Sequence, residues 1–175
     1  MARGDFRVLS KVWRHSTLRR ERKLKIFSSL ILSRLLYSLG TACLLKADLR
    51  RLDGFQYRCI RQIMNIPAAY VSRVSNESVF SKAGVSAASR VLLQRQLIYL
   101  GKPMRAPVGD PLRDVSFIGN TLAPATGQYV RRVGRPRTEW VPTVVYQARQ
   151  HFGALELEAA ARDPLYWKTF VKSRA

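Results

Sequence analysis

The chain has 175 residues, which suits one domain with an appendage or two small units. Hydrophobic residues make up 47% of it and every aromatic type occurs, so we expect a packed core rather than wholesale disorder. Lys and Arg number 31 against 11 Asp and Glu, giving a formal net charge of +20. A chain this basic repels itself unless a polyanion is nearby. Nucleic acid is the first candidate and an anionic membrane surface the second, while a merely basic or ribosome-associated protein is the alternative.

The residues that could carry chemistry are few and dispersed. Cys43 and Cys59 lie in apolar stretches without metal-ligand spacing and are predicted to be small buried hydrophobes of a reducing compartment. His15 and His151 are far apart, so we expect no zinc site. The carboxylates are scattered singly, whereas a nucleotide polymerase needs paired carboxylates to hold two metal ions. We therefore predict that the chain alone is not an enzyme and that it takes no metal or other cofactor.

A long helix is expected near the start of the chain. It should begin at a cap on Ser16 or Thr17 and run to about Leu45, with a basic first half at 18–25 and a second half that is apolar almost all round. The apolar half also raises the question of a membrane span. Arg34 lies in its middle, and a central Arg costs about 2.5–3.5 kcal/mol on insertion scales, so we predict no membrane insertion.

The second helix is predicted to have two different faces. It should begin at a cap on Asp48 and run to about Ile66, where Pro67 stops it. One stripe is apolar and should pack. The other side is cationic and includes Tyr57, which favours contact with phosphates over an ordinary mixed-charge surface.

Further helices are expected downstream, and no convincing strand pattern or internal repeat is found. A short helix should run from Ser75 or Asn76 to Gly84, and another from Ser86 to Gly101. The Pro- and Gly-rich region 103–136 is the linker candidate, with a short helix near 112–118. Two helices should follow at 139–151 and 154–172, the second kinked at Asp163-Pro164. The expected fold is all-α: a small helical bundle at 1–105, a basic linker at 106–137 and a C-terminal helical segment at 138–175.

The sharpest local signal is an arginine-rich strip, Arg131-Arg132-Val133-Gly134-Arg135-Pro136-Arg137. Arginines around Gly and Pro cannot form a helix and would present an extended cationic strip to phosphates or to a narrow minor groove. Gly134-Arg135-Pro136 resembles the central residues of an AT-hook, a minor-groove peptide, but Val133 stands where that motif has Arg. The alternative is a solvated linker whose charge only aids solubility.

Short motifs follow one another in a recognisable order. They are Trp13, Lys25-Ile26-Phe27, Leu35-Leu36-Tyr37 with Ser38 where a Gly is usual, Arg51-Leu52-Asp53 with Phe55-Gln56 and Cys59-Ile60-Arg61, and Arg73-Val74-Ser75-Asn76-Glu77. Leu97 to Gly101 follows, with Lys102 in place of a His, then Gly134-Arg135-Pro136-Arg137 with Trp140, and Asp163 with Trp167, where Pro164 replaces an Arg. In this order they resemble the thumb and downstream region of LINE-type (non-LTR) retrotransposon reverse transcriptases.

The resemblance implies a thumb that grips RNA, RNA–DNA or DNA duplex through its backbone, with the fingers and palm that carry the catalytic centre preceding residue 1 and acting as partner. It also implies a nuclear location, to which the basic runs add support. The candidate nucleic-acid-binding residues are Lys23, Lys25, Arg50, Tyr57, Arg58, Arg61, Arg131, Arg132, Arg135 and Arg137. The alternatives are a stand-alone minor-groove DNA-binding module, a membrane-surface protein, and a retrotransposon relic that does not fold independently.

Overall fold

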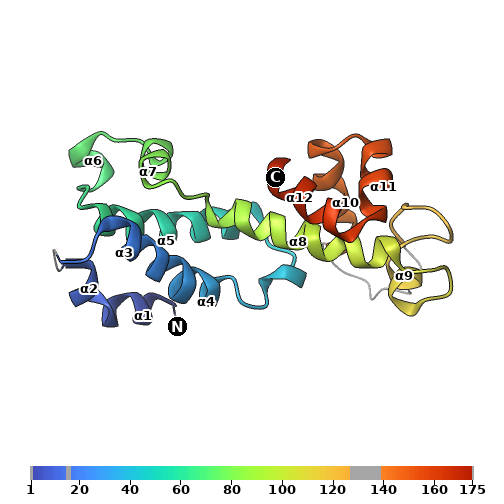
Figure 1. Cartoon of the computed structure of the whole chain (residues 1–175), viewed down its shortest axis with the longest axis horizontal. Coiled ribbons are helices and arrows are strands. Elements are labelled where there is room, and N and C mark those ends of the chain that lie inside the picture. Colours follow the sequence, from blue (N-terminus) through green and yellow to red (C-terminus); the bar gives the residue numbers. More distant parts are fainter. Residues whose placement is uncertain (1, 15–16, 127–138, 175) are drawn as a thin grey trace. The chain divides into compact units, whose positions relative to one another are not determined.

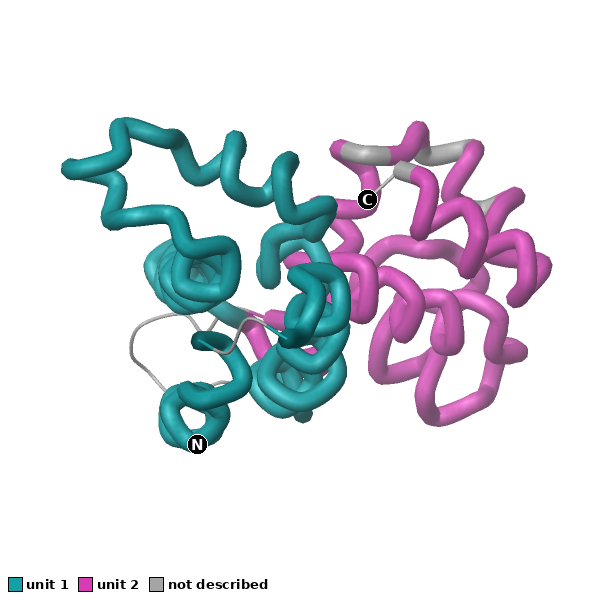
Figure 2. The backbone as a smooth tube through the Cα atoms, turned by 60° about the vertical axis from the view of Figure 1, so that its left-hand side comes forward, with its two compact units in different colours: residues 1–39, 44–91 teal, residues 40–43, 92–175 magenta. Residues whose placement is uncertain are grey.

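The computed structural model describes residues 2–14, 17–126 and 139–174. Within these ranges the chain consists of helices joined by turns and loops, and the one pairing of extended backbone is an isolated antiparallel bridge between Phe117 and Pro124 (Figure 1). The all-α expectation is confirmed. The chain divides into two compact units, unit 1 from residues 1–39 and 44–91 and unit 2 from residues 40–43 and 92–175 (Figure 2).

Unit 1 begins with two short helices, and the long helix that follows them is a continuous run over residues 20–35 that is shorter than predicted. Its elements are α1 (Ala2–Val8), α2 (Ser10–Arg14), α3 (Arg20–Ile26), the π-helical segment η1 (Phe27–Leu32), α4 (Ser33–Leu35), α5 (Lys46–Met64), α6 (Ala69–Ser72) and α7 (Asn76–Ala83). The helix expected to reach Leu45 ends at Leu35, with Leu36 as its C-cap, before a short 3-10 turn, η2 (Leu39–Thr41). The reason is Ser38, whose φ of 60° places it in the left-handed region where a right-handed helix cannot continue.

An aromatic cluster holds the N-terminal helices of unit 1 together. The Phe6 ring stacks on Trp13 with centroids 5.1 Å apart and meets Phe27 edge-on at 6.1 Å. The indole Nε1 of Trp13 donates to the Phe6 carbonyl at 2.9 Å. Aromatic pairs of this kind add about 0.5–1.5 kcal/mol beyond the area they bury. This cluster explains why α1 and α2, which are too short to be stable alone, have a fixed place against η1 and α5.

The helix ends of α5 and α7 test the predicted caps. The Asp48 cap was wrong: α5 begins at Lys46, its cap residue Leu45 makes no side-chain bond, and Asp48 lies inside the first turn. The helix ends at Met64, followed by Asn65 in the left-handed conformation with φ 56°. The Ser75 cap is confirmed, because its hydroxyl accepts the N–H of Ser78 at 3.2 Å. Helix α7 then ends at Ala83, with Gly84 as its left-handed C-cap at the predicted position.

Unit 2 is built around the long helix α8 (Ala88–Arg105), whose first turn belongs to unit 1. The remaining helices are α9 (Pro111–Ser116), α10 (Trp140–His151), α11 (Ala154–Arg162) and α12 (Pro164–Arg174). The predicted helix end at Gly101 was wrong, since α8 continues through Pro103 to Arg105. Gly101 instead receives the indole of Trp167, which donates to the Leu97 carbonyl at 2.9 Å. The single kinked helix predicted at 154–172 is two helices, because Asp163 is extended and ends α11 before Pro164 begins α12; the predicted position of the kink is where the chain breaks.

The segment expected to be a linker is packed over the part that the structure describes. Arg113 is 7% exposed, and its guanidinium donates to the carbonyls of Met104 at 2.9 Å and Ala106 at 3.2 Å. Phe117 is buried in the core of unit 2. The compact units therefore divide the chain within α8 rather than at residue 105, because a buried cation and a buried ring tie residues 106–126 to unit 2.

The conformation of Ser38 leads to a stability prediction for unit 1. Replacing Ser38 by Gly removes the Cβ contact that a left-handed residue suffers and should raise the free energy of unfolding by about 0.5–1 kcal/mol in urea titrations. The same change at Ser81, which lies in the right-handed helix α7, should lower it by about 0.5 kcal/mol. Equal losses in the two variants would mean that Ser38 is not left-handed.

The contact between Gly101 and Trp167 leads to a second prediction. A Cβ on Gly101 would lie 2.5 Å from Nε1 of Trp167 and 2.9 Å from Nη1 of Arg105, so Gly101→Ala should cost about 2–3 kcal/mol. Gly54 is the matched control, because it also lies inside a helix and a Cβ there meets nothing within 4 Å. Gly54→Ala should gain about 1 kcal/mol. A gain in both variants, measured by thermal or urea unfolding, would contradict the packing of Trp167 against α8.

Candidate nucleic-acid interface

The positive charge is concentrated in unit 1. Its residues include eighteen Lys and Arg and five Asp and Glu. Two of those carboxylates form ion pairs, Asp5 with Arg34 at 2.8 Å and Asp48 with Arg51 at 3.3 Å. Asp53 is engaged elsewhere, because it accepts both the N–H and the hydroxyl of Ser89. Five carboxylates cannot neutralise eighteen cations, so most of the charge in unit 1 is uncompensated by the unit itself.

The N-terminal helices carry a regular row of cations. Arg3, Arg7, Lys11 and Arg14 are all exposed, and we call them the N-terminal stripe. The hydrogen bonds from Leu9 N–H to the Asp5 carbonyl and from Trp13 N–H to the Leu9 carbonyl continue the helical pattern between α1 and α2. At 100° per residue the four cations fall within an arc of about 80°, away from the buried side that carries Phe6 and Trp13. The stripe is therefore a linear array that points to solvent.

Helix α3 adds a second exposed group of cations, and it includes one of the predicted residues. Arg19, Arg20, Arg22 and Lys25 are exposed at or within α3. Lys23 is not. It is 5% exposed, and its Nζ donates to the Trp13 carbonyl at 2.9 Å. Its assignment as a phosphate contact is corrected, because its ammonium group is used to join α3 to the end of α2.

The predicted cationic face of α5 is present over part of its length. Arg50 and Arg58 are exposed, and Lys46 lies on the same side one turn before Arg50. Gly54 separates Arg50 from Arg58 on this side, and the Nε of Arg58 donates to the Gly54 carbonyl at 3.2 Å. These residues can contact an anion without any change in the packing of α5.

Arg61 and Tyr57 lie on the predicted side of α5 but are built into the protein. Arg61 is 4% exposed, and its guanidinium donates to the carbonyls of Pro67 and Val74 and to the hydroxyl of Ser72. The ring of Tyr57 lies over that guanidinium, with 4.5 Å from ring centroid to Cζ. The chain after α5 folds back over this end of the helix. Arg61 is therefore removed from the candidate interface, and Tyr57 acts mainly as its cover.

The remaining predicted residues, Arg131, Arg132, Arg135 and Arg137, lie outside the described residues. Their role as a cationic strip stays a prediction. The N-terminal stripe, by contrast, was missed by sequence reasoning, although the spacing of basic residues by four, four and three positions from Arg3 to Arg14 was a readable helical signal.

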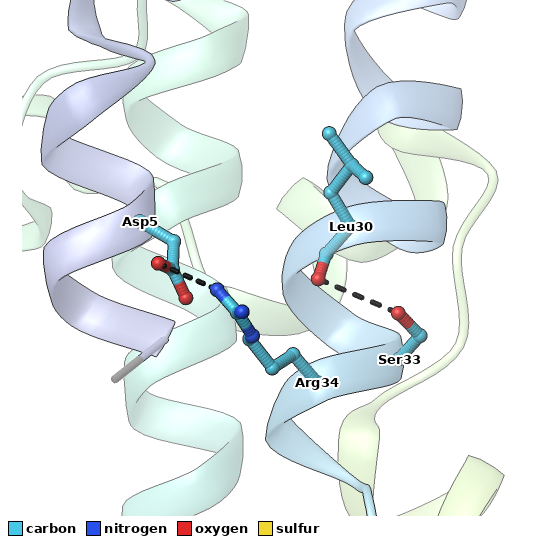
Figure 3. A network of polar contacts seen from close by, with 4 residues as sticks. All are labelled: Asp5, Leu30, Ser33 and Arg34. Atoms are coloured by element: carbon cyan, nitrogen blue, oxygen red, sulfur yellow. Dashed lines mark hydrogen bonds and ion pairs between the residues drawn. The ribbon is translucent and has the colours of Figure 1, made fainter.

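Unit 1 also has a hollow of about 760 Å³ between α1 and the segment formed by η1 and α4. Figure 3 shows its polar edge, where Arg34 pairs with Asp5 and the hydroxyl of Ser33 donates to the Leu30 carbonyl at 3.4 Å. The Arg34 pair is largely exposed and contributes less than about 1 kcal/mol. Since Arg34 already has a carboxylate partner, this hollow is a poor phosphate site and we leave it out of the interface.

The two cysteine thiols of the described residues are poorly ionised. Burial raises the pKa of the Cys43 thiol, and it raises the pKa of Cys59 to about 12 against the opposing effect of the Arg58 cation. Neither thiol is activated as a nucleophile. No group of three or more His, Cys, Asp or Glu in the described ranges could hold a metal ion. Likewise, none of the described helices is long and apolar enough to span a membrane.

In comparisons with known proteins, no family model, curated protein or solved structure matches this chain.

Proposed function

We propose that this chain binds the phosphate backbone of RNA, RNA–DNA or DNA duplex through unit 1, as a non-catalytic part of a polymerase that resembles LINE-type reverse transcriptases. The observation that carries the proposal is the exposed N-terminal stripe, in a unit whose carboxylates cannot neutralise its cations. Each phosphate bound by Lys or Arg releases counterions, so an array of this kind gives affinity without sequence preference.

Several motif residues have conformations that support the family part of the proposal. Ser38, which stands where the family has Gly, adopts a φ of 60° that Gly accommodates without strain. Gly101 and Trp167 come from two separate motifs and are in direct contact. Trp140, from a third motif, donates from Nε1 to the Gly40 carbonyl at 2.9 Å. Residues of separate motifs thus contact each other or adopt the conformation that the motif residue favours, which supports the proposed resemblance.

The chain's own acids are dispersed, which agrees with a gripping role and with a catalytic centre supplied by a fingers and palm partner. Such a protein would act in the nucleus, where a retrotransposon meets its genomic target. The alternative of a stand-alone minor-groove module depends on Arg131 to Arg137 and would show as a preference for A/T-rich duplex that is lost in Arg135→Ala.

The salt dependence of binding tests the proposal. We expect the logarithm of the association constant for duplex to fall linearly with the logarithm of salt concentration. Changing Arg3, Arg7, Lys11 and Arg14 to Gln should reduce the magnitude of that slope by about 3–4, because each phosphate contact contributes about 0.9. The measurement is fluorescence anisotropy of a labelled duplex at salt concentrations of roughly 50–300 mM.

The control removes the same amount of charge elsewhere. Arg149, Arg162, Lys168 and Lys172 are exposed residues of unit 2, and their replacement by Gln should leave the slope nearly unchanged. Equal reductions in the two variants would refute a localised interface, and a wild-type affinity that does not depend on salt would refute the phosphate mechanism altogether.

A further inference from the structure

A short segment of unit 1 exposes apolar and aromatic surface to solvent. Tyr70 is 87% exposed and Val71 is 61% exposed, both in helix α6. Arg73 follows directly, is also exposed, and has a φ of 51° in the left-handed region. A tyrosine ring so exposed gains nothing from the core of its own protein, so its position does not follow from the packing of unit 1.

This segment is nevertheless firmly held from below. The buried guanidinium of Arg61 binds the carbonyls of Pro67 and Val74, which lie on either side of α6, and the Ser72 hydroxyl between them. The same hydroxyl donates to the Ala68 carbonyl at 3.1 Å and accepts the Val74 N–H at 3.4 Å. One buried cation thus fixes the backbone of residues 67–74, and Tyr70 is presented on an ordered support. Preorganisation of this kind lowers the entropic cost of binding a ligand.

The end of unit 1 that carries α6 also carries several exposed arginines. In Figure 1, α6 lies at the same end of unit 1 as the end of α2 and the start of α3. These ends carry Arg14, Arg19 and Arg20, all exposed, and Arg73 follows Tyr70 three residues later in the chain. An exposed aromatic ring beside arginines is the combination with which proteins bind single-stranded nucleic acid, since phosphates pair with the cations and a base stacks on the ring.

We propose that Tyr70 is a base-stacking residue that binds an unpaired nucleobase of a strand whose phosphates contact the arginines at this end of unit 1. This inference rests on the proposed function, because it assigns a further site to the same nucleic-acid ligand. A nucleobase is favoured over a membrane surface because Tyr70 and Val71 present a small apolar area, while one aromatic ring matches one base. Tyr70 supplies the stacking surface, Arg73 supplies charge, and Arg61 is a positioning residue that touches no ligand.

Binding of a labelled single-stranded oligonucleotide, measured by anisotropy, tests the site. Tyr70→Ala should weaken binding by about 5- to 150-fold, the range of one lost base–aromatic stack. Tyr70→Phe should bind as the wild type does, since stacking needs the ring and not the hydroxyl. Tyr37→Ala is the matched control, because Tyr37 belongs to the same unit and is 79% exposed. It should change affinity less than about twofold, and blunt duplex should respond less than single strand to Tyr70→Ala.

The outcomes separate this site from the function on which it rests. If wild-type protein binds oligonucleotides without salt dependence, the proposed function fails. If binding depends on salt as expected but Tyr70→Ala binds single strand as the wild type does, the stacking site alone is refuted. Equal losses in the Tyr70 and Tyr37 variants would also refute it. A further outcome is that the wild-type protein sediments with vesicles that contain phosphatidylserine. If Tyr70→Ala abolishes this sedimentation and leaves oligonucleotide binding unchanged, α6 belongs to a membrane surface instead.

Discussion

Both units depend on hydrogen bonds from buried cationic side chains to backbone carbonyl oxygens. Lys23 binds the Trp13 carbonyl, Arg61 binds those of Pro67 and Val74, and Arg113 binds those of Met104 and Ala106. A buried charge costs several kcal/mol unless its donors are satisfied. With 31 cations and 11 carboxylates in the chain, carbonyl oxygens are the more abundant acceptors. Each bond joins segments that have no sheet to align them.

Because carboxylates are scarce, the cations fall into two groups: buried ones that bind backbone carbonyls and exposed ones. A buried cation needs carbonyls held at the right distance, and the described structure provides them at a few places. The other cations remain in solvent, where neighbours of like charge repel them and a polyanion relieves the repulsion. Arg61 connects the two groups: its guanidinium is part of the interior, yet the loop that it fixes carries Tyr70 at the surface. Scaffold and proposed interface are therefore consequences of one charge imbalance.

Sequence periodicity and caps predicted the all-α fold, the limits of α7 and a change of direction at Asp163-Pro164, which proves to be a full break between α11 and α12. These signals failed where a residue distant in the sequence determines the local structure. The pattern predicts a helix end at Gly101, whereas Gly101 lies inside α8 and makes room for Trp167, which is remote in sequence. Arg61 was correctly placed on the side of α5 that carries Arg50, but periodicity gives no sign that the following loop covers it. Periodicity did not indicate the left-handed conformation of Ser38, because serine rarely adopts it; the one hint was that Ser38 stands where a Gly is usual in the resembled family. The N-terminal stripe was missed because the first helix was predicted to begin only at Ser16 or Thr17, although the spacing of Arg3, Arg7, Lys11 and Arg14 is helical.

The separation of interior and surface cations can be tested directly by NMR of arginine side chains in ¹⁵N-labelled protein, with and without duplex. The account predicts guanidinium signals of Arg61 and Arg113 that exchange slowly with water and do not move when duplex is added. Those of Arg3, Arg7 and Arg14 should exchange fast in the free protein and shift or sharpen with duplex. Fast exchange at Arg61 and Arg113, or shifts there as large as those of the N-terminal stripe, would contradict the account.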